Sequence, residues 1–304
     1  MKRKITFIIL LALVFSLCIP SAATAFAESK SPEITVYPDQ KNAAKDAYGD
    51  YEFTETAITI DYEGIEIAAT LAMPVTDENV PFIILCHGYT GSQNHFNAYS
   101  KVYASNGIGN LRFDFPANGK SGGDSTEISL LTEKKVLEFL LDYSKTIPGV
   151  NENQIFLGGQ SMGGAVATLC GVEHQDEICG LILCFPGYPI PDFTRMGTVL
   201  GTEFDLDNLP ETLEIYNYTV GSVFITDALD IDFYNDILPR MEKDVLIFHG
   251  TNDDMIDLEY SRQAVEVLPS ARLVVVDGYG HGFPGFVLAD IMPISVDFIR
   301  EHCE

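Results

Sequence analysis

Basic residues are scarce in this chain. Its 304 residues include 18 Lys and Arg against 44 Asp and Glu, which gives a formal net charge of −26. Such an excess of negative charge repels polyanions, so we expect neither nucleic acid nor an anionic membrane as a partner. Solubility outside the cell is enough to explain the charge, which therefore indicates no particular substrate.

Cysteines are few and irregularly spaced. Five of the six follow residue 27, and they are Cys86, Cys170, Cys179, Cys184 and Cys303. An odd number without regular spacing is not a disulfide framework, although Cys170 and Cys179 could pair. Cys86 and Cys184 lie in apolar runs and are expected to be small buried residues. No cluster of Cys and His has metal-ligand spacing, so the sequence predicts no zinc site, and we expect no bound metal.

Only the beginning of the chain holds a long apolar run. Three basic residues precede an apolar stretch at 5–19, and small residues at 23–27 offer cleavage sites. This arrangement predicts a secretory signal peptide at 1–27, so we expect a secreted protein without stable membrane association after cleavage. The alternative is an uncleaved membrane anchor, although the run is short for a full span.

The remainder has the composition of a folded protein, since the chain is 46% hydrophobic and 20% charged. Residues 28–50 are polar and predict a mobile or loosely docked lead-in, and one domain is expected over 51–304. Alternating segments within 53–72 flank the turn at 61–64 and predict a β-hairpin. There is no internal repeat and no low-complexity tract.

Short apolar runs then alternate with helix-compatible segments. The predicted strands are 82–86, 108–113, 154–157, 180–185, 245–248 and 272–276. The predicted helices are 96–105, 129–145, 162–170, 258–268 and 288–301. This alternation predicts an α/β fold, in which a mostly parallel central sheet has helices on both faces and the hairpin at one edge.

Residues 188–240 interrupt the alternation. They contain prolines, aromatic residues and many acidic residues, without a clear strand–helix unit. A segment of this length between two core strands is expected to be an inserted cap rather than an unstructured loop. Its aromatic residues either line a pocket or form the core of the cap, and the candidates are Tyr188, Phe193, Tyr216 and Tyr218.

Ser161 stands in the middle of G-Q-S-M-G, which matches the pattern G-x-S-x-G. The motif falls between the predicted strand 154–157 and the predicted helix that begins at Met162. At such a turn the two outer glycines remove clashes and expose the serine oxygen, and the helix N-terminus favours developing negative charge. This context favours a nucleophilic serine over a simple glycine-rich turn.

A nucleophilic serine needs a base and an acid. His281 follows the last predicted strand in D-G-Y-G-H-G and is the candidate base, with helix capping as its alternative role. Asp253 and Asp254 follow the preceding strand in H-G-T-N-D-D. The spacing H-G-x-x-D favours Asp253 as the acid that orients the histidine, while Asp254 remains an alternative or a helix cap. His249, in the same motif, is interpreted as a packing or turn residue.

The order serine, aspartate, histidine along the chain is that of the α/β-hydrolases. Their oxyanion hole requires two N–H groups at the point where negative charge develops. Met162, directly after the serine, is expected to supply one. Tyr89 in H-G-Y-T-G-S, after the first apolar strand, is expected to supply the other, with Thr90 as the alternative.

With these motifs the chain resembles the α/β-hydrolases and, more narrowly, the bacterial cinnamoyl (feruloyl) esterases. H-G-Y-T-G-S is similar to that group's H-G-F-T-G-N, and L-R-F-D-F at 111–115 is similar to its R-F-D-F segment. The acid and histidine loops are also similar, over about residues 52–300. The chain departs from the group in its general elbow motif, in G-K-S-G-G-D-S, and in the divergent insertion.

The resemblance implies a cofactor-free serine carboxylesterase that forms an acyl-enzyme and acts on a small ester, with feruloyl or cinnamoyl esters as candidates. It assigns Ser161, Asp253 and His281 as the catalytic triad, and Tyr89 and Met162 as the oxyanion hole. A short-chain acyl esterase, a lipase, a serine peptidase and a non-catalytic binding protein are the alternatives. The acidic insertion disfavours a lipase, and the intact triad disfavours a binding protein. The sequence indicates no oligomeric state.

Overall fold

A computed structural model of the chain describes residues 33–38 and 47–303. The predicted signal peptide at 1–27 lies outside the described residues, and the lead-in is described only in part. Within the described residues, no helix is long and apolar enough to cross a membrane.

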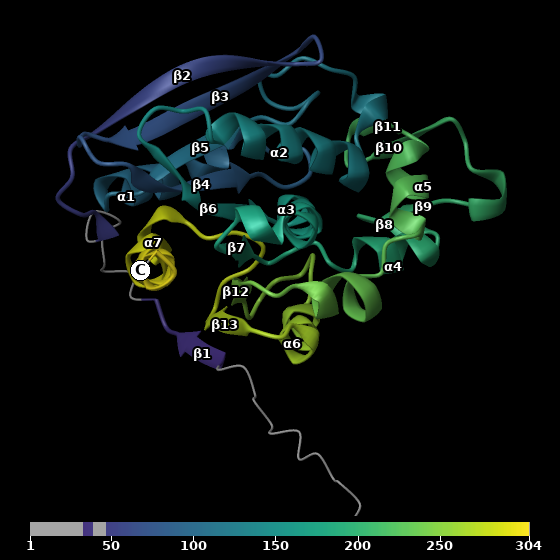
Figure 1. Cartoon of the computed structure of the whole chain (residues 1–304). Helices are drawn as coiled ribbons and strands as arrows, with labels where there is room; N and C mark the ends of the chain where they lie inside the picture. Colours follow the sequence, from purple (N-terminus) through teal and green to yellow (C-terminus); the bar gives the residue numbers. More distant parts are fainter. Residues whose placement is uncertain (1–32, 39–46, 304) are drawn as a thin grey trace, which may run out of the picture. The chain divides into compact units, whose positions relative to one another are not determined.

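In the part of the chain that the structure describes, nine strands form one central sheet (Figure 1). Its order is β1-β13-β12-β7-β6-β4-β5-β3-β2. The strands are β1 (Glu33–Val36), β2 (Phe53–Tyr62), β3 (Ile65–Pro74), β4 (Val80–Cys86), β5 (Gly109–Phe113), β6 (Val150–Gln160), β7 (Gly180–Cys184), β12 (Asp244–Gly250) and β13 (Ala271–Val276). All neighbours from β1 to β5 pair in parallel, whereas β3 is antiparallel to both β5 and β2. The predicted parallel sheet with a hairpin at one edge is therefore confirmed.

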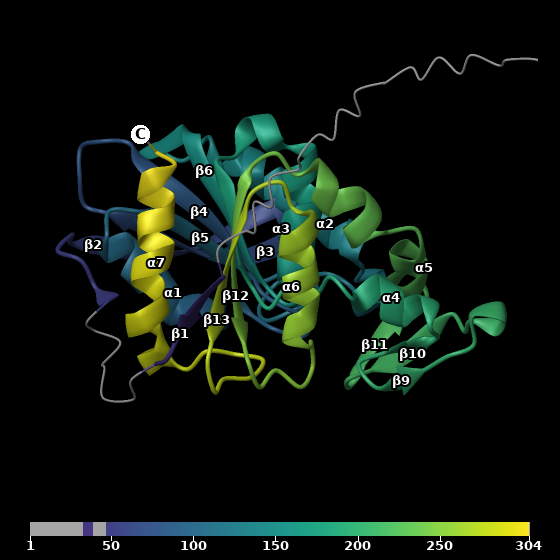
Figure 2. The same ribbon diagram turned by 90° about the horizontal axis from the view of Figure 1, so that it is seen from below.

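Helices cover both faces of the sheet (Figure 2). They are α1 (Asn97–Ser105), α2 (Leu130–Ser144), α3 (Met162–Glu173), α6 (Leu258–Val267) and α7 (Leu288–Glu301). Successive side chains of a strand point to opposite faces. In β4, Phe82 and Ile84 therefore join the core under α2, α3 and α6, whereas Ile83 and Leu85 join the core under α1 and α7. Burial on both faces explains why the runs are continuously apolar.

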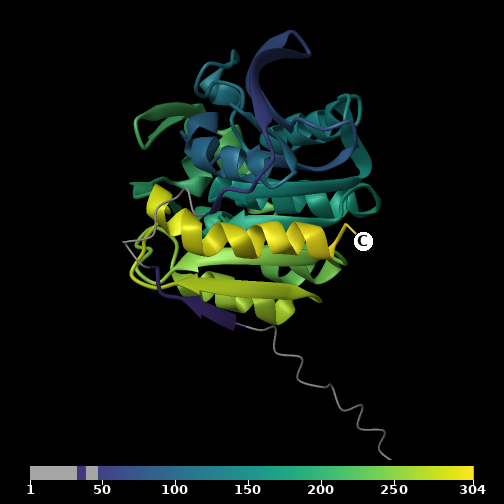
Figure 3. The same ribbon diagram turned by 90° about the vertical axis from the view of Figure 1, so that its left-hand side faces the viewer.

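The two edges of the sheet differ (Figure 3). The β2–β3 hairpin forms one edge, as the sequence predicts. At the other edge, β1 lies within the predicted lead-in and pairs in parallel with β13. Glu33 of β1 also forms an ion pair with Arg262 of α6. Four alternating residues in a polar segment are too short a signal to predict this strand.

The segment 188–240, here called the cap, stands between β7 and β12. It contains α4 (Ile190–Arg195), β8 (Thr198–Val199), β9 (Thr202–Glu203), β10 (Thr212–Ile215), β11 (Tyr218–Gly221) and α5 (Val223–Leu229). β10 and β11 form an antiparallel hairpin. Ile215, Val220 and Phe224 are buried in the core that also lies under α2 and α3, so the cap packs on the body of the domain.

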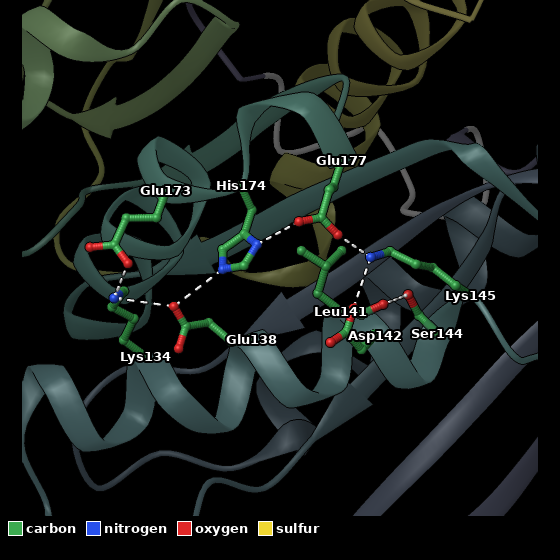
Figure 4. Close-up of polar contacts among 9 residues, drawn as sticks. All are labelled: Lys134, Glu138, Leu141, Asp142, Ser144, Lys145, Glu173, His174 and Glu177. Atoms are coloured by element: carbon green, nitrogen blue, oxygen red, sulfur yellow. Dashed lines mark hydrogen bonds and ion pairs between the residues drawn. The ribbon is translucent and has the colours of Figure 1, made fainter.

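A chain of charged side chains joins α2 to the end of α3 at the surface (Figure 4). Its centre is His174, whose Nε2 lies 3.2 Å from a Glu138 oxygen and whose Nδ1 lies 2.7 Å from a Glu177 oxygen. Burial would lower the pKa of His174, but its hydrogen bonds to the two carboxylates outweigh burial and raise it. The rest of this network consists of Lys134, Glu173, Lys145 and Asp142.

Candidate active site

Ser161 lies on a strained turn between β6 and α3. Its φ of 52° and ψ of −124° place a non-glycine residue at positive φ, which costs free energy and is typical of functional sites. The turn packs closely against the end of β4. A Cβ on Gly163 would lie 2.3 Å from the carbonyl oxygen of His87, so only glycine fits there. The strand–turn–helix setting that the motif predicts is present.

Asp253 and His281 are in direct contact. His281 Nδ1 lies 2.8 Å from Asp253 Oδ2, and since a carboxylate only accepts, Nδ1 carries the hydrogen. Asp253 Oδ1 accepts from the N–H groups of Met255 and Ile256, at 3.0 and 2.9 Å. The His281 Nε2 atom is thereby left as the basic nitrogen. Asp254 is exposed and lines the pocket described below, so the geometry favours Asp253 as the orienting acid.

The Asp253 carboxyl is held in its ionised form. Burial would raise its pKa, but hydrogen bonds from His249, from His281 and from the Ile256 N–H outweigh burial and hold the pKa well below its usual range. A negative charge at this position stabilises His281 whenever the imidazole is protonated.

His249 is a site residue that the sequence analysis missed. It is fully buried, and its Nε2 lies 2.9 Å from the Ile256 carbonyl oxygen and 3.3 Å from Asp253 Oδ2. Because a carbonyl only accepts, Nε2 carries a hydrogen, and Nδ1 is hydrogen-bonded to the Ser261 hydroxyl at 2.7 Å. The interpretation of His249 as a packing residue is therefore incomplete. The sequence did offer a clue to this contact, because His249 is the first residue of H-G-x-x-D and precedes the acid by four residues.

The loop after β4 brings Tyr89 next to the serine. Gly88 to Gly91 form a turn closed by the Gly91 N–H and the Gly88 carbonyl oxygen at 2.9 Å, with Thr90 at a φ of 56°. A Cβ on Gly88 would lie 3.0 Å from the Ser161 Cβ, so glycine permits this close approach. The closing hydrogen bond does not involve the Tyr89 N–H, which can therefore serve a ligand.

Met162 is the first residue of α3, where backbone N–H groups have no intrahelical partner. Met162, Tyr89, Ser161 and His281 all line one pocket. The structure thus assembles the five predicted site residues, four around this pocket and Asp253 behind His281. Two N–H groups beside a serine can stabilise an oxyanion.

His87 supports the same loop from inside the protein. Its Nδ1 donates to the Gly88 carbonyl oxygen at 2.8 Å, and its Nε2 accepts from the Phe115 N–H at 3.0 Å. Burial lowers the pKa of His87 to about 4, so the ring is neutral at neutral pH and can make both contacts. A fixed neutral tautomer at this position keeps the Gly88 peptide in one orientation.

The pocket has a volume of about 760 Å³, within the usual range for small-molecule sites. The body of the domain contributes Phe185, Ile256 and Phe283, and the cap contributes apolar residues that include Ile190, Val199 and Phe224. The four cap aromatics named from the sequence divide into two groups. Phe193 and Tyr216 line the pocket. Tyr188 is buried core, and Tyr218 packs on Tyr89.

The described residues contain no group of three or more His, Cys, Asp and Glu side chains that could hold a metal ion. The five cysteines after residue 27 are free thiols, so the considered pairing of Cys170 with Cys179 is not present. Cys86 and Cys184 are buried in strands, as expected.

Comparisons with known proteins agree with this architecture. A family model described as "Serine aminopeptidase, S33" matches residues 77–205. Est1E from Butyrivibrio proteoclasticus, in a structure with bound ferulic acid, superimposes with a TM-score of 0.75 and 28% identity, covering 81% of this chain and 99% of that chain. Esterase YjfP from Escherichia coli K12 is 21% identical over 249 residues, which are 78% of this chain and 96% of YjfP.

Protein bem46 from Schizosaccharomyces pombe is 26% identical over 141 residues, which are 43% of this chain and 46% of bem46. The chain spans less than half the length of the first curated relatives it matches. The fold is that of the α/β hydrolases, and the chain is similar in sequence to proteins described as esterases. More narrowly, the predicted resemblance to feruloyl esterases is confirmed by the similarity to Est1E, which binds ferulic acid.

Proposed function

We propose that this protein is a secreted serine carboxylic ester hydrolase that acts through an acyl-enzyme, with feruloyl or related aromatic acyl esters as its substrates. One observation carries the proposal. A strained serine and a histidine oriented by a buried carboxylate line the same apolar pocket, beside two backbone N–H groups.

In the proposed reaction, Ser161 Oγ attacks the ester carbonyl carbon while His281 Nε2 takes the hydroxyl proton. The N–H groups of Tyr89 and Met162 stabilise the oxyanion. The tetrahedral intermediate then expels the alcohol, which takes the proton from His281, and the acyl-enzyme remains. Water attacks the acyl-enzyme with the same histidine as base, and the carboxylic acid leaves with Ser161 restored.

The preference for an aromatic acyl group rests on the lining of the pocket and on the relative that it resembles. Phe193, Phe224 and other apolar cap residues offer aromatic and aliphatic surface on which a planar ring can pack. Est1E, the similar protein, binds ferulic acid. Short acyl chains would leave most of this surface in contact with water.

The test compares the mature chain with its Ser161→Ala variant on p-nitrophenyl acetate, methyl ferulate and a long-chain p-nitrophenyl ester. We expect turnover that is lost in the variant and highest kcat/KM on methyl ferulate. A preference for acetate would retain the esterase and reject the aromatic acyl group. An inactive wild type whose Ser161 is not labelled by a fluorophosphonate would refute the mechanism.

Secretion is proposed from the sequence of residues 1–27. Expression of the full chain in a secreting bacterium and N-terminal sequencing of the exported protein tests it. We expect a new N-terminus near residue 28, whereas an intact N-terminus in the membrane fraction would indicate an anchor.

A serine peptidase is the second candidate, because the matching family model carries an aminopeptidase description. In support, the exposed carboxylate of Asp254 lines the pocket and could pair with a substrate ammonium group. Hydrolysis of aminoacyl p-nitroanilides that exceeds ester hydrolysis, and that falls in Asp254→Asn, would favour this activity.

A further inference from the structure

The side chain of Tyr89 leaves the loop after β4 and enters the cap. Its hydroxyl donates to the carbonyl oxygen of Ile215 at 2.9 Å. Its ring packs on Phe224 and Tyr218, at centroid distances of 5.3 and 6.1 Å. The residue whose backbone N–H is proposed for the oxyanion hole is therefore bound, through its side chain, to a different part of the fold.

The acceptor, Ile215, ends β10 and precedes a tight turn. Tyr216 and Asn217 form this turn with φ values of 51° and 67°, which two-residue hairpins require and which non-glycine residues adopt at a cost. Tyr216 is 60% exposed and lines the pocket. The Tyr89 hydroxyl thus binds the hairpin at the residue directly before Tyr216, which lines the pocket.

The hairpin depends on such anchors. β10 and β11 have four residues each, and a two-stranded hairpin alone is marginally stable in water. Besides Tyr89, Ser125 of the body donates to the Thr219 carbonyl oxygen at 2.6 Å. Each contact also restrains the segment of the body that donates the hydrogen bond, which is the loop of Tyr89 in one case and the segment of Ser125 in the other.

The loop that carries Tyr89 needs restraint. Thr90 is β-branched and held at positive φ, so the turn from Gly88 to Gly91 has a strained backbone. His87 fixes the beginning of this turn through the Gly88 carbonyl oxygen. After Gly88, the next restrained group is the Tyr89 side chain, which belongs to the residue whose N–H is proposed to bind the oxyanion.

We propose that the Tyr89 hydroxyl is a positioning group, which fastens the loop to the cap hairpin and thereby holds the Tyr89 N–H in place for the oxyanion. The inference rests on the proposed esterase function and deepens it. The Tyr89 side chain would thereby help to stabilise the transition state without contacting the acyl group of the substrate.

The experiment uses Tyr89→Phe, which keeps the ring and removes the hydroxyl. The substrate is p-nitrophenyl acetate, whose acyl group is too small to depend on contacts with the cap. Loss of one neutral hydrogen bond corresponds to a fall of about fivefold in kcat, with KM unchanged. The rate of inactivation by diethyl p-nitrophenyl phosphate should fall by the same factor, since its phosphoryl oxygen requires the same donors.

Tyr234→Phe is the matched control. The Tyr234 hydroxyl donates to the Tyr260 carbonyl oxygen at 3.1 Å, so it also joins the cap to the body through a tyrosine and a backbone acceptor. Tyr234 does not line the pocket. We expect its variant to keep wild-type kcat, even if its melting temperature falls as much as that of Tyr89→Phe.

Three results would overturn the inference. They are an unchanged kcat in Tyr89→Phe, a rise in KM at constant kcat, and an equal loss of kcat in Tyr234→Phe. Active-site titration of each folded variant with the phosphate ester ensures that kcat refers to active molecules. Failure of the proposed function is a different outcome, since the wild type itself would then neither hydrolyse the ester nor react with the phosphate ester.

Discussion

The central sheet and the cap are held together in different ways. In β4, β6, β7 and β12, apolar side chains are buried on both faces, and packing against helices fixes the strand ends. The strands of the cap have only two or four residues. The cap depends in addition on single polar contacts with the body, which are Tyr89 with Ile215, Ser125 with Thr219 and Ser129 with Asp227.

The body and the cap also contribute differently to the proposed reaction. Ser161, Asp253, His281 and the residues of both proposed N–H donors belong to the body, and Tyr89 is in addition hydrogen-bonded to the cap through its hydroxyl. The cap supplies apolar lining such as Phe193. Changes in the body should therefore alter the rate for every ester, whereas changes in the cap should alter the preference among esters.

The largest effect is expected at the acid. Asp253→Asn keeps the size of the side chain but no longer holds the required tautomer of His281, so kcat should fall about 10⁴-fold on all esters. Asp254→Asn is the matched control and should change ester turnover less than about fivefold, because an exposed charge contributes at most about 1 kcal/mol. Steady-state kinetics of both variants checks this, and a larger loss in the Asp254 variant would reverse the assignment.

A smaller effect in the body is expected at His249. His249→Phe removes a hydrogen-bond donor to a buried carboxylate, so kcat should fall about tenfold to a hundredfold on every ester. His249→Gln keeps an N–H donor and should recover part of the loss. Because the donor helps to lower the pKa of Asp253, the pH–rate profile should shift in the Phe variant, and an unshifted profile would indicate a packing role alone.

In the cap, Phe193→Ala should change substrate preference. Removal of an apolar ring from the pocket should reduce kcat/KM for methyl ferulate roughly tenfold, because the acyl group loses packing surface. Turnover of p-nitrophenyl acetate should stay within about twofold, as the acetyl group does not depend on that surface. An equal loss on both esters would contradict the division between body and cap.

The smallest effect is expected far from the pocket, at His174. Its pKa is raised in the folded state above the unfolded value of about 6.5. The resulting stabilisation is complete below the unfolded pKa and is lost as the pH rises through the folded pKa. His174→Gln should therefore lower the melting temperature by about 1–2 °C near pH 5.5 and by less near pH 8.5, since a partly exposed network contributes little. Ester turnover should not change.

Much of the body could be predicted because its strands and its serine turn are each indicated by a short stretch of neighbouring residues. Continuous apolar runs gave the positions of six parallel strands, and G-Q-S-M-G gave the strand–turn–helix around Ser161. The element β1 was missed because its partner, β13, is more than 230 residues away in the chain. The contact of His249 with Asp253 was missed because a histidine at the end of a strand is more often a packing residue.

In the cap, the sequence alone indicated an insertion and named four aromatic residues, but not which of them face the pocket. That division depends on how α4, the β10–β11 hairpin and α5 pack on the body, and on polar contacts such as that between Tyr89 and Ile215. Periodicity and short motifs report the geometry of a few neighbouring residues. The environment of Phe193 or Tyr188 is set by elements distant in the chain, so only the tertiary structure decided it.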